Sequence, residues 1–361
     1  MTLRRSVLHS FVATQARGVQ ERFGWELPVA YTDVAAEFQA ATEGVAVHDA
    51  SYVGRLKAEG RDVLDLLNRM SSNKVISLPS GQGAPTILTT DRGRILDLIG
   101  VVSTGDYILL ITSPGNQKTV IEWLDKYTIM EDITVGDITA EAAMLSVLGP
   151  GSRVALESAA AIRLDQLQPF HSVMAQFGGQ PIRIIRRHLG ELPCFDLIVP
   201  ADAASPVWQH LVTAGITPVG MEAYEAVRVK YGAPSFGREI GESYNPLEAG
   251  LIGSINFEKG CYIGQEVIAR LDTYKKVQRH LAMLRFPPGL AVPAGTSLRQ
   301  EGQEVGAVTS VARIPTTGEV VGLGYVKNSA AIVGIRLELA GIAGGWAQVE
   351  QLPQLFGPGK D

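Results

Sequence analysis

The sequence predicts an α+β protein whose last part is a separate all-β domain. Over roughly the first two-thirds of its 361 residues, amphipathic helical stretches alternate with short apolar runs. After about residue 276, short strands are separated by Pro-Gly and Gly-Gln turns, with hardly any helical pattern. A hydrophobic content of 46% and a charged content of 19% are ordinary for a globular protein. We therefore expect mixed helices and strands, followed by a β-barrel or a jelly roll.

Four stretches of the mixed part have the periodicity of amphipathic helices, and these are residues 61–70, 116–127, 205–215 and 220–232. In the third stretch we expect Ser205 to be the N-cap, because serine is favoured at that position. The fourth stretch is expected to end at Gly232. Apolar runs on both sides of the turn DRG predict two strands within residues 86–102.

Composition and charge exclude several classes of function. A net charge of −5 argues against a general nucleic-acid binder, which would usually be basic. No apolar run approaches the roughly 20 residues that are needed to cross a bilayer, so we expect no membrane partner. Two cysteines, Cys194 and Cys261, are too few for a disulfide framework, which predicts a reducing compartment and a cytoplasmic protein. We expect Cys194 to be a core residue of a strand.

Common catalytic signatures are absent from the sequence, and six scattered histidines have no metal-ligand spacing, so no metal site is expected. Three polar residues nevertheless lie in apolar surroundings. Asp97, within GRILDLIGVV, either faces solvent at a strand edge or is kept in these apolar surroundings for a functional role. The pattern alone favours the solvent-facing position. Glu191 has a position typical of a turn. Arg228 lies on the fourth predicted helix, where an arginine stem often covers apolar surface.

One of the two cysteines lies in the stretch EKGCYIGQE, where Gln265 is expected to begin a helix. A thiol just ahead of a helix N-terminus lies in the positive field of the helix dipole, which favours its thiolate form, and Lys259 would add to this effect. The alternative is that Cys261 is a small buried residue in a tight turn, with Gly260 and Gly264 required for the shape of the backbone.

Long motifs occur in one order along nearly the whole chain, and they are FGWELPVAY (23–31), GVAVHDASYVGRLKAEGRDVLDLLNRMSSN (44–73), GRILDLIGVV (93–102), MLSVLGPGS (144–152), GELPCFDL (190–197) and NPLEAGL (245–251). Together with the C-terminal β run, they resemble the T-protein superfamily. This superfamily comprises the aminomethyltransferase of the glycine cleavage system and its YgfZ-type relatives. The motif EKGCYIGQE resembles the signature of the YgfZ-type branch.

The resemblance implies a three-lobed fold with tetrahydrofolate bound near its middle. The first two lobes would be interleaved α+β units with a ferredoxin-like antiparallel sheet, and the last lobe would be a β-barrel. We place the lobes at residues 1–140, 141–275 and 276–361. The first of these would be the folate-binding lobe.

The resemblance also implies roles for individual residues. Asp97 matches the catalytic aspartate of the family, where a carboxylate would stabilise positive charge that develops on the one-carbon unit. Glu191 matches the glutamate that grips the pterin, since a carboxylate can accept two parallel bonds from the ring, and it is expected to be buried at the end of a cleft. Arg228 and Asn116 match the folate site, where Arg228 could bind the anionic glutamyl tail.

The sequence departs from the aminomethyltransferase pattern near Asp97. Arg94 replaces a glycine, Leu98 replaces a second aspartate, and Pro85 stands where a tyrosine of the folate site is usual. These changes weaken the case for one-carbon chemistry, whereas the retained Asp97 supports it. The aminomethyltransferase normally has no cysteine at position 261, so EKGCYIGQE favours the YgfZ-type branch and a functional Cys261.

Three functions are therefore open. The leading hypothesis is a tetrahydrofolate-binding protein of the YgfZ type, which supports the assembly or maintenance of iron–sulfur proteins. The alternative is a folate-dependent aminomethyltransferase that transfers a one-carbon unit to tetrahydrofolate and uses a lipoyl carrier protein or a methylated amine as donor. A scaffold that has lost folate ranks last, because Glu191 would then be an idle surface carboxylate.

Overall fold

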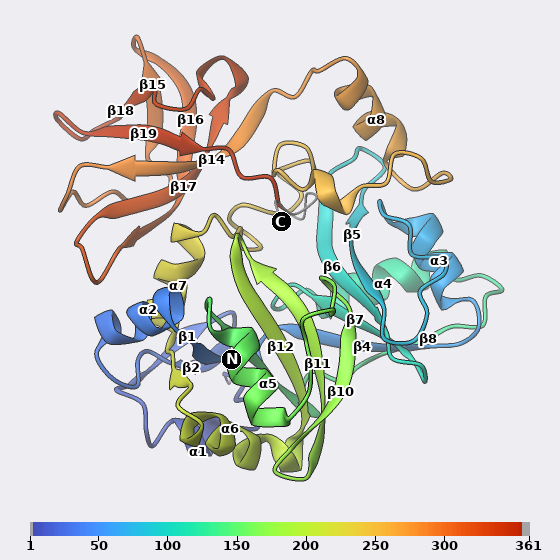
Figure 1. Cartoon of the computed structure of the whole chain (residues 1–361). Coiled ribbons are helices and arrows are strands. Elements are labelled where there is room, and N and C mark those ends of the chain that lie inside the picture. The colour runs from blue at the N-terminus through green and yellow to red at the C-terminus, as the bar shows by residue number, and fades with distance from the viewer. Residues whose placement is uncertain (1–2, 356–361) are drawn as a thin grey trace. The chain divides into compact units, whose positions relative to one another are not determined.

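The structure is a computed structural model in which residues 3–355 are described (Figure 1). The described chain divides into two compact units. As far as the described residues reach, the first comprises Met1–Asn68, Lys74–Thr86 and Ile99–Tyr224, and the second comprises Arg69–Asn73, Ile87–Leu98 and Glu225–Asp361. Two short segments from the N-terminal part of the chain, Arg69–Asn73 and Ile87–Leu98, therefore belong to the same unit as its C-terminal part.

The first unit contains a six-stranded sheet with the strand order β10-β11-β12-β9-β3-β13. Figure 1 shows its strands β10, β11 and β12 in green. Its strands are β3 (Ala46–Asp49), β9 (Ala142–Leu148), β10 (Ser172–Phe177), β11 (Gln180–Leu189), β12 (Leu192–Pro200) and β13 (Thr217–Pro218). All neighbouring strands are antiparallel except β13 and β3. Cys194 lies on β12 and is 5% exposed, which confirms its predicted place in a strand of the core.

The helices α5 (Ser152–Ala160) and α6 (Ala204–Thr213) contact this sheet and bury Leu156 and Trp208 in one apolar cluster. The prediction of Ser205 as N-cap of α6 is wrong, because a 3₁₀ turn over Ala201–Ala203 runs directly into the helix. The helix therefore begins before Ser205. The same unit contains α1 (His9–Val12), α2 (Val34–Glu43) and the hairpin of β1 (Val19–Arg22) and β2 (Trp25–Pro28).

A five-stranded sheet has the order β5-β6-β7-β4-β8. Its strands are β4 (Gly54–Glu59), β5 (Gly83–Thr89), β6 (Ile95–Ser103), β7 (Ile108–Thr112) and β8 (Thr134–Asp137). The strands β5 and β6 confirm the predicted pair of strands around the turn DRG. The helices α3 (Val63–Met70) and α4 (Gln117–Tyr127) confirm two of the predicted amphipathic helices.

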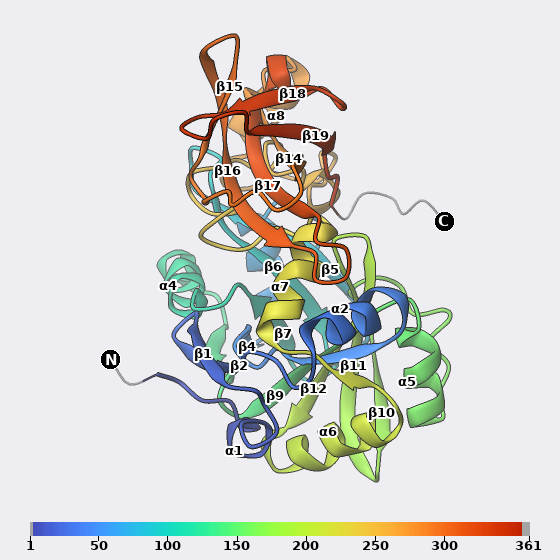
Figure 2. The ribbon, with the colours of Figure 1, turned by 90° about the vertical axis from the view of Figure 1, so that its left-hand side faces the viewer.

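The second unit contains a closed barrel with the order β14-β17-β16-β15-β18-β19, drawn in orange and red in Figures 1 and 2. Its strands are β14 (Arg279–Phe286), β15 (Ser297–Gln300), β16 (Gln303–Arg313), β17 (Val320–Lys327), β18 (Arg336–Leu339) and β19 (Trp346–Gln351). Closure leaves no unpaired edge strand. Its interior is filled by side chains such as Phe286 and Leu298. The register of β16 shifts between Val308 and Ser310, and such a bulge changes the direction of nearby side chains.

Helix α7 (Met221–Lys230) carries the chain from the first unit into the second, and Gly232 follows it with φ +69°, as the sequence predicts for a helix end. Helix α8 (Gln265–Thr273) lies in the second unit, where Ile268 packs with Ile87 and Ile95 near the turn between β5 and β6.

The mixed α+β class, the antiparallel sheets and the C-terminal β-barrel are confirmed. The lobe boundaries at residues 1–140, 141–275 and 276–361 stay a prediction, and the first and last of their residues lie outside the described part of the chain.

Candidate functional site

The predicted site residues are divided between the two units. Asn116 and Glu191 belong to the first, whereas Asp97, Arg228 and the stretch EKGCYIGQE belong to the second. The contacts within each unit therefore define what each residue can do.

Asp97 is the third residue of β6 and is 0% exposed. The expectation from pattern alone, that this carboxylate faces solvent, is wrong. The strand order places β6 inside the sheet, between β5 and β7, although its pairs with β7 begin only at Gly100. Burying a carboxylate is unfavourable unless other groups compensate it, so a fully buried aspartate on an apolar strand is a candidate functional group.

Glu191 is exposed and lies in the two-residue turn between β11 and β12, after Gly190 with φ +62°. The neighbouring residues Leu189 and Leu192 are paired across the hairpin, so the chain reverses at Gly190 and Glu191. The expectation that Glu191 is buried at the end of a cleft is therefore wrong, and the turn position is correct. Its contact with a pterin stays a prediction.

Asn116 is 5% exposed and occupies the N-cap position of α4, just after Gly115 with φ +76°. Its backbone N–H donates to the carbonyl of Ser113 at 3.2 Å. The glycine lets the chain turn sharply into the helix, which fixes the backbone of the asparagine. A role for Asn116 in binding folate stays a prediction.

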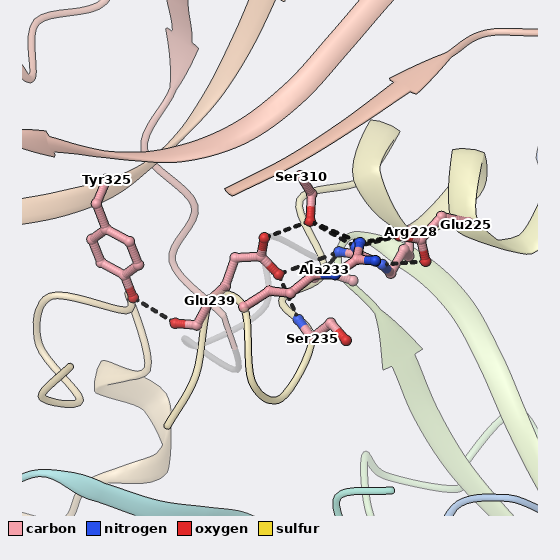
Figure 3. Close-up of polar contacts among 8 residues, drawn as sticks. Glu225, Arg228, Ala233, Ser235, Glu239, Ser310 and Tyr325 are labelled. Carbon is pink, nitrogen blue, oxygen red and sulfur yellow. Dashed lines mark hydrogen bonds and ion pairs between the residues drawn. The ribbon is translucent and has the colours of Figure 1, made fainter. Parts of the chain in front are cut away.

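Arg228, on α7, is 4% exposed and lies among acceptors on every side of its guanidinium group (Figure 3). Its Nε and Nη2 donate to the two carboxylate oxygens of Glu225 at 2.8 and 2.6 Å. Nη1 donates to the carbonyl of Ala233 at 3.1 Å and to Oε2 of Glu239 at 3.4 Å, and Nη2 also donates to Oγ of Ser310 at 2.8 Å. A guanidinium has five N–H groups, and these five bonds use all of them.

Glu239 completes this cluster and is 0% exposed (Figure 3). Its Oε1 accepts from Oγ of Ser310 at 2.6 Å, and its Oε2 accepts from the N–H of Ser235 at 2.9 Å. Its backbone carbonyl accepts from the hydroxyl of Tyr325 at 2.7 Å. Ser310 is on β16 and Tyr325 is on β17, so the cluster fastens the end of α7 and the following loop to the barrel.

The cluster changes the interpretation of Arg228. Binding a glutamyl tail would require Arg228 to exchange one of its present partners for the ligand, so that role stays a prediction. Sequence reasoning missed Glu225, Glu239 and Ser310. No pattern in the sequence could have paired Glu239 with Ser310, because they are 71 residues apart.

The stretch EKGCYIGQE holds an amine, a ring and a thiol close together in sequence. Lys259 is half-buried, its Nζ donates to the carbonyl of Ser71 at 2.6 Å, and it lies 5.1 Å from the centroid of the Tyr262 ring. Burial lowers the pKa of Lys259 to about 8. Cys261 is exposed, which contradicts the alternative of a buried residue in a tight turn.

Helix α8 begins at Gln265, as predicted, with Gly264 as its N-cap. Gly264 has φ +82°, and a Cβ atom there would lie 2.5 Å from the carbonyl oxygen of Thr90, so glycine is required. A Cβ at Gly260 would meet nothing within 4 Å, so the expectation that the backbone requires glycine there is wrong. Cys261 lies three residues before the N-cap and hence outside the first turn of the helix.

No group of three or more histidine, cysteine or acidic residues that could hold a metal ion occurs in residues 3–355. Within the same residues, every helix is too short or too polar to span a bilayer.

Comparison with known proteins places the chain in a family. Residues 8–259 match the GCVT N-terminal domain, and residues 279–356 match the glycine cleavage T-protein C-terminal barrel domain. The chain therefore belongs to the glycine cleavage T-protein family.

Two relatives and one solved structure illustrate the similarity. An Arabidopsis thaliana protein whose name describes it as a transferase of the chloroplast is 33% identical over 301 residues, which are 82% of this chain and 68% of that protein. The aminomethyltransferase of Halothermothrix orenii is 30% identical over 322 residues, which are 87% of this chain and 89% of that protein. The crystal structure of the glycine cleavage system aminomethyltransferase T from Bartonella henselae has a TM-score of 0.86 at 21% identity and covers 98% of each chain, which shows a shared fold.

Proposed function

We propose that this chain is a folate-dependent aminomethyltransferase of the glycine cleavage type, which transfers a one-carbon unit to tetrahydrofolate. From the sequence alone, a YgfZ-type role in iron–sulfur protein maintenance is the leading hypothesis. The comparisons favour the transferase, because several relatives that match most of this chain are named aminomethyltransferases. The observation that carries the proposal is the buried carboxylate of Asp97 on β6.

The residues fit tetrahydrofolate in part. In the second unit, Asp97 is a buried polar group that suits a polar ligand, whereas the donors of Arg228 are in use. In the first unit, Asn116 is buried and Glu191 is exposed. When bound, tetrahydrofolate would supply the N5 and N10 nitrogens that carry the one-carbon unit. Asp97 would act as a fixed negative charge that favours the build-up of positive charge at the reacting carbon. Arg228 would hold the barrel and α7 in place, and its contact with the glutamyl tail stays a prediction.

The experiment combines a binding titration with an activity assay. Purified protein is titrated with tetrahydrofolate by calorimetry, and turnover is measured with tetrahydrofolate and a lipoylated carrier protein as the aminomethyl donor. The proposal predicts both binding and transfer. A protein that binds folate but transfers nothing from the carrier, or from a methylated amine, would contradict it.

Glu191 is tested in the same titration. If its carboxylate grips the pterin, Glu191→Ala weakens binding by about 2–4 kcal/mol, because two donors of the ring lose their acceptor. Glu266, exposed at the start of α8, offers a control, because Glu266→Ala removes an equal charge from the second unit. Equal affinities of both variants would remove Glu191 from the site.

A second candidate function is the YgfZ-type role, in which the chain binds folate and supports iron–sulfur proteins as partners. The exposure of Cys261 favours it, since a thiol that works must be accessible. Cells that lack the protein are complemented with Cys261→Ser, and an iron–sulfur enzyme is assayed. The role predicts loss of rescue with folate affinity unchanged. Full rescue by a folded Cys261→Ser protein would remove this candidate.

A further inference from the structure

Two arginines of the second unit share the same two acceptors. Nη1 of Arg94, just before β6, lies 3.3 Å from the carbonyl oxygen of Ser243, and Nη2 of Arg279, on β14, lies 2.5 Å from the same atom. Arg94 Nη1 also lies 3.5 Å from Oε2 of Glu248, while Arg279 Nε lies 3.3 Å from Oε1. The two guanidinium groups are therefore close neighbours.

The charges at this point do not balance. Two guanidinium cations face one carboxylate, that of Glu248, whose side chain is 6% exposed. Glu242 is exposed and close in sequence, but within residues 3–355 it forms no ion pair. One positive charge is left over. Like charges held close together repel, so an arrangement of this kind favours the arrival of an anion.

The position of Arg279 is fixed by stacking. Its guanidinium carbon lies 4.7 Å from the ring centroid of Tyr244 and 5.2 Å from that of Tyr325. The two rings are themselves stacked at 3.9 Å. Arg94 is held through the backbone, because the N–H of the next residue, Ile95, donates to the carbonyl of Tyr244 at 3.0 Å. Such preorganisation lowers the entropy lost when a ligand binds.

Both arginines keep donors for a ligand. The side chain of Arg94 is 42% exposed and that of Arg279 is 36% exposed. Within the described part of the chain, three of their nitrogens donate no hydrogen bond, and these are Nε and Nη2 of Arg94 and Nη1 of Arg279. We propose that Arg94 and Arg279 form a binding site for a carboxylate group. A carboxylate carries the single negative charge that is missing, and its two oxygens match the fork of an arginine.

This site is separate from the proposed one-carbon chemistry. Arg94 lies before the first residue of β6, and neither arginine is among the residues of the proposed one-carbon chemistry. The carboxylate has two possible sources, a free small dicarboxylate or a γ-glutamyl chain of the kind that folates carry. The site does not depend on the proposed function, because each source can be tested without turnover.

The test is calorimetric titration of the full chain with glutarate and with γ-linked triglutamate at low ionic strength. Arg94→Gln and Arg279→Gln are expected to weaken binding about 10-fold or more, since each removes charge-assisted hydrogen bonds. Arg285→Gln is the matched control, because Arg285 is 45% exposed and already has one partner, Glu350 at 2.9 Å. The affinity of the Arg285→Gln protein for each probe should stay within about 2-fold of that of the wild type.

The outcomes distinguish the two sources of the carboxylate from each other, and both of them from a result that overturns the proposal. Tight binding of triglutamate alone identifies a γ-glutamyl chain, and equal binding of glutarate identifies a free carboxylate. Binding that survives in both arginine variants, or that is lost equally in Arg285→Gln, would overturn the site. So would the absence of carboxylate binding, or inorganic phosphate binding more tightly than either probe. Circular dichroism of each variant verifies that it is folded.

Discussion

Arg228 and Glu239 form an ion pair in the interior of the second unit, with Nη1 of the arginine 3.4 Å from Oε2 of the glutamate. Their side chains are 5% and 0% exposed. Because Ser310 donates to Glu239 and accepts from Arg228, the pair is linked to the barrel by the same hydrogen bonds that compensate its charges (Figure 3). A buried pair of this kind contributes mainly through the penalty for breaking it.

Glu239→Ala should therefore destabilise the protein strongly. The substitution leaves Arg228 with less compensating charge and leaves the Ser235 N–H without its acceptor, which together should lower the free energy of unfolding by about 3–5 kcal/mol. Urea unfolding followed by circular dichroism measures the change. Glu350→Ala is the control, because that glutamate is 40% exposed and its pair with Arg285 should contribute no more than about 1 kcal/mol. Equal losses in the two variants would contradict the structural role of the cluster.

Gly264→Ala should destabilise the protein, whereas Gly260→Ala should not. At Gly264 both the φ of +82° and the nearby carbonyl of Thr90 oppose a side chain, so we expect a loss of about 1–3 kcal/mol or more. At Gly260 the added methyl group meets open space, and the change should stay within about 0.5 kcal/mol. Thermal unfolding of both variants measures the difference. If Gly260→Ala were the more harmful, the motif would not be held as described.

The pKa of Lys259, lowered to about 8 by burial, predicts a pH dependence of stability. The unfolded chain keeps this proton up to the usual range of lysine, so between about pH 8 and pH 10 it binds more protons than the folded chain. Stability attributable to Lys259 should therefore rise with pH in that window. The free energy of unfolding of the wild type, relative to Lys259→Met, should increase from pH 8 to pH 10. Parallel pH profiles of the two proteins would show that Lys259 titrates normally.

Much of the fold could be predicted from the sequence, because periodicity reports local structure. The helices α3 and α4, the strands around the turn DRG and the all-β end all follow from short-range patterns. The start of α6 could not be predicted, since Ser205 is a good cap by itself. Only the preceding 3₁₀ turn makes the helix begin earlier in the sequence, at Ala204.

The site was harder to predict, because burial depends on residues that are distant in sequence. Asp97 has the pattern of a solvent-facing residue, yet its side chain is fully buried. The resemblance placed Arg228 in a ligand site, but its partners Glu239 and Ser310 come from a loop and a barrel strand that no local pattern connects to it. Likewise, no local pattern in the sequence indicates that Arg94 and Arg279 lie close together.

The most direct test of the proposed one-carbon transfer is Asp97→Asn, which keeps the shape of the side chain and removes its charge. Turnover with tetrahydrofolate and a lipoylated carrier is measured beside folate affinity, with Asp91→Asn in the exposed turn before β6 as the control. We expect Asp97→Asn to lower turnover about 10-fold or more while folate affinity changes little, and Asp91→Asn to change neither. Full turnover in the Asp97→Asn protein, or an equal loss of turnover and affinity, would contradict the role of Asp97 as the charge that stabilises the reacting carbon.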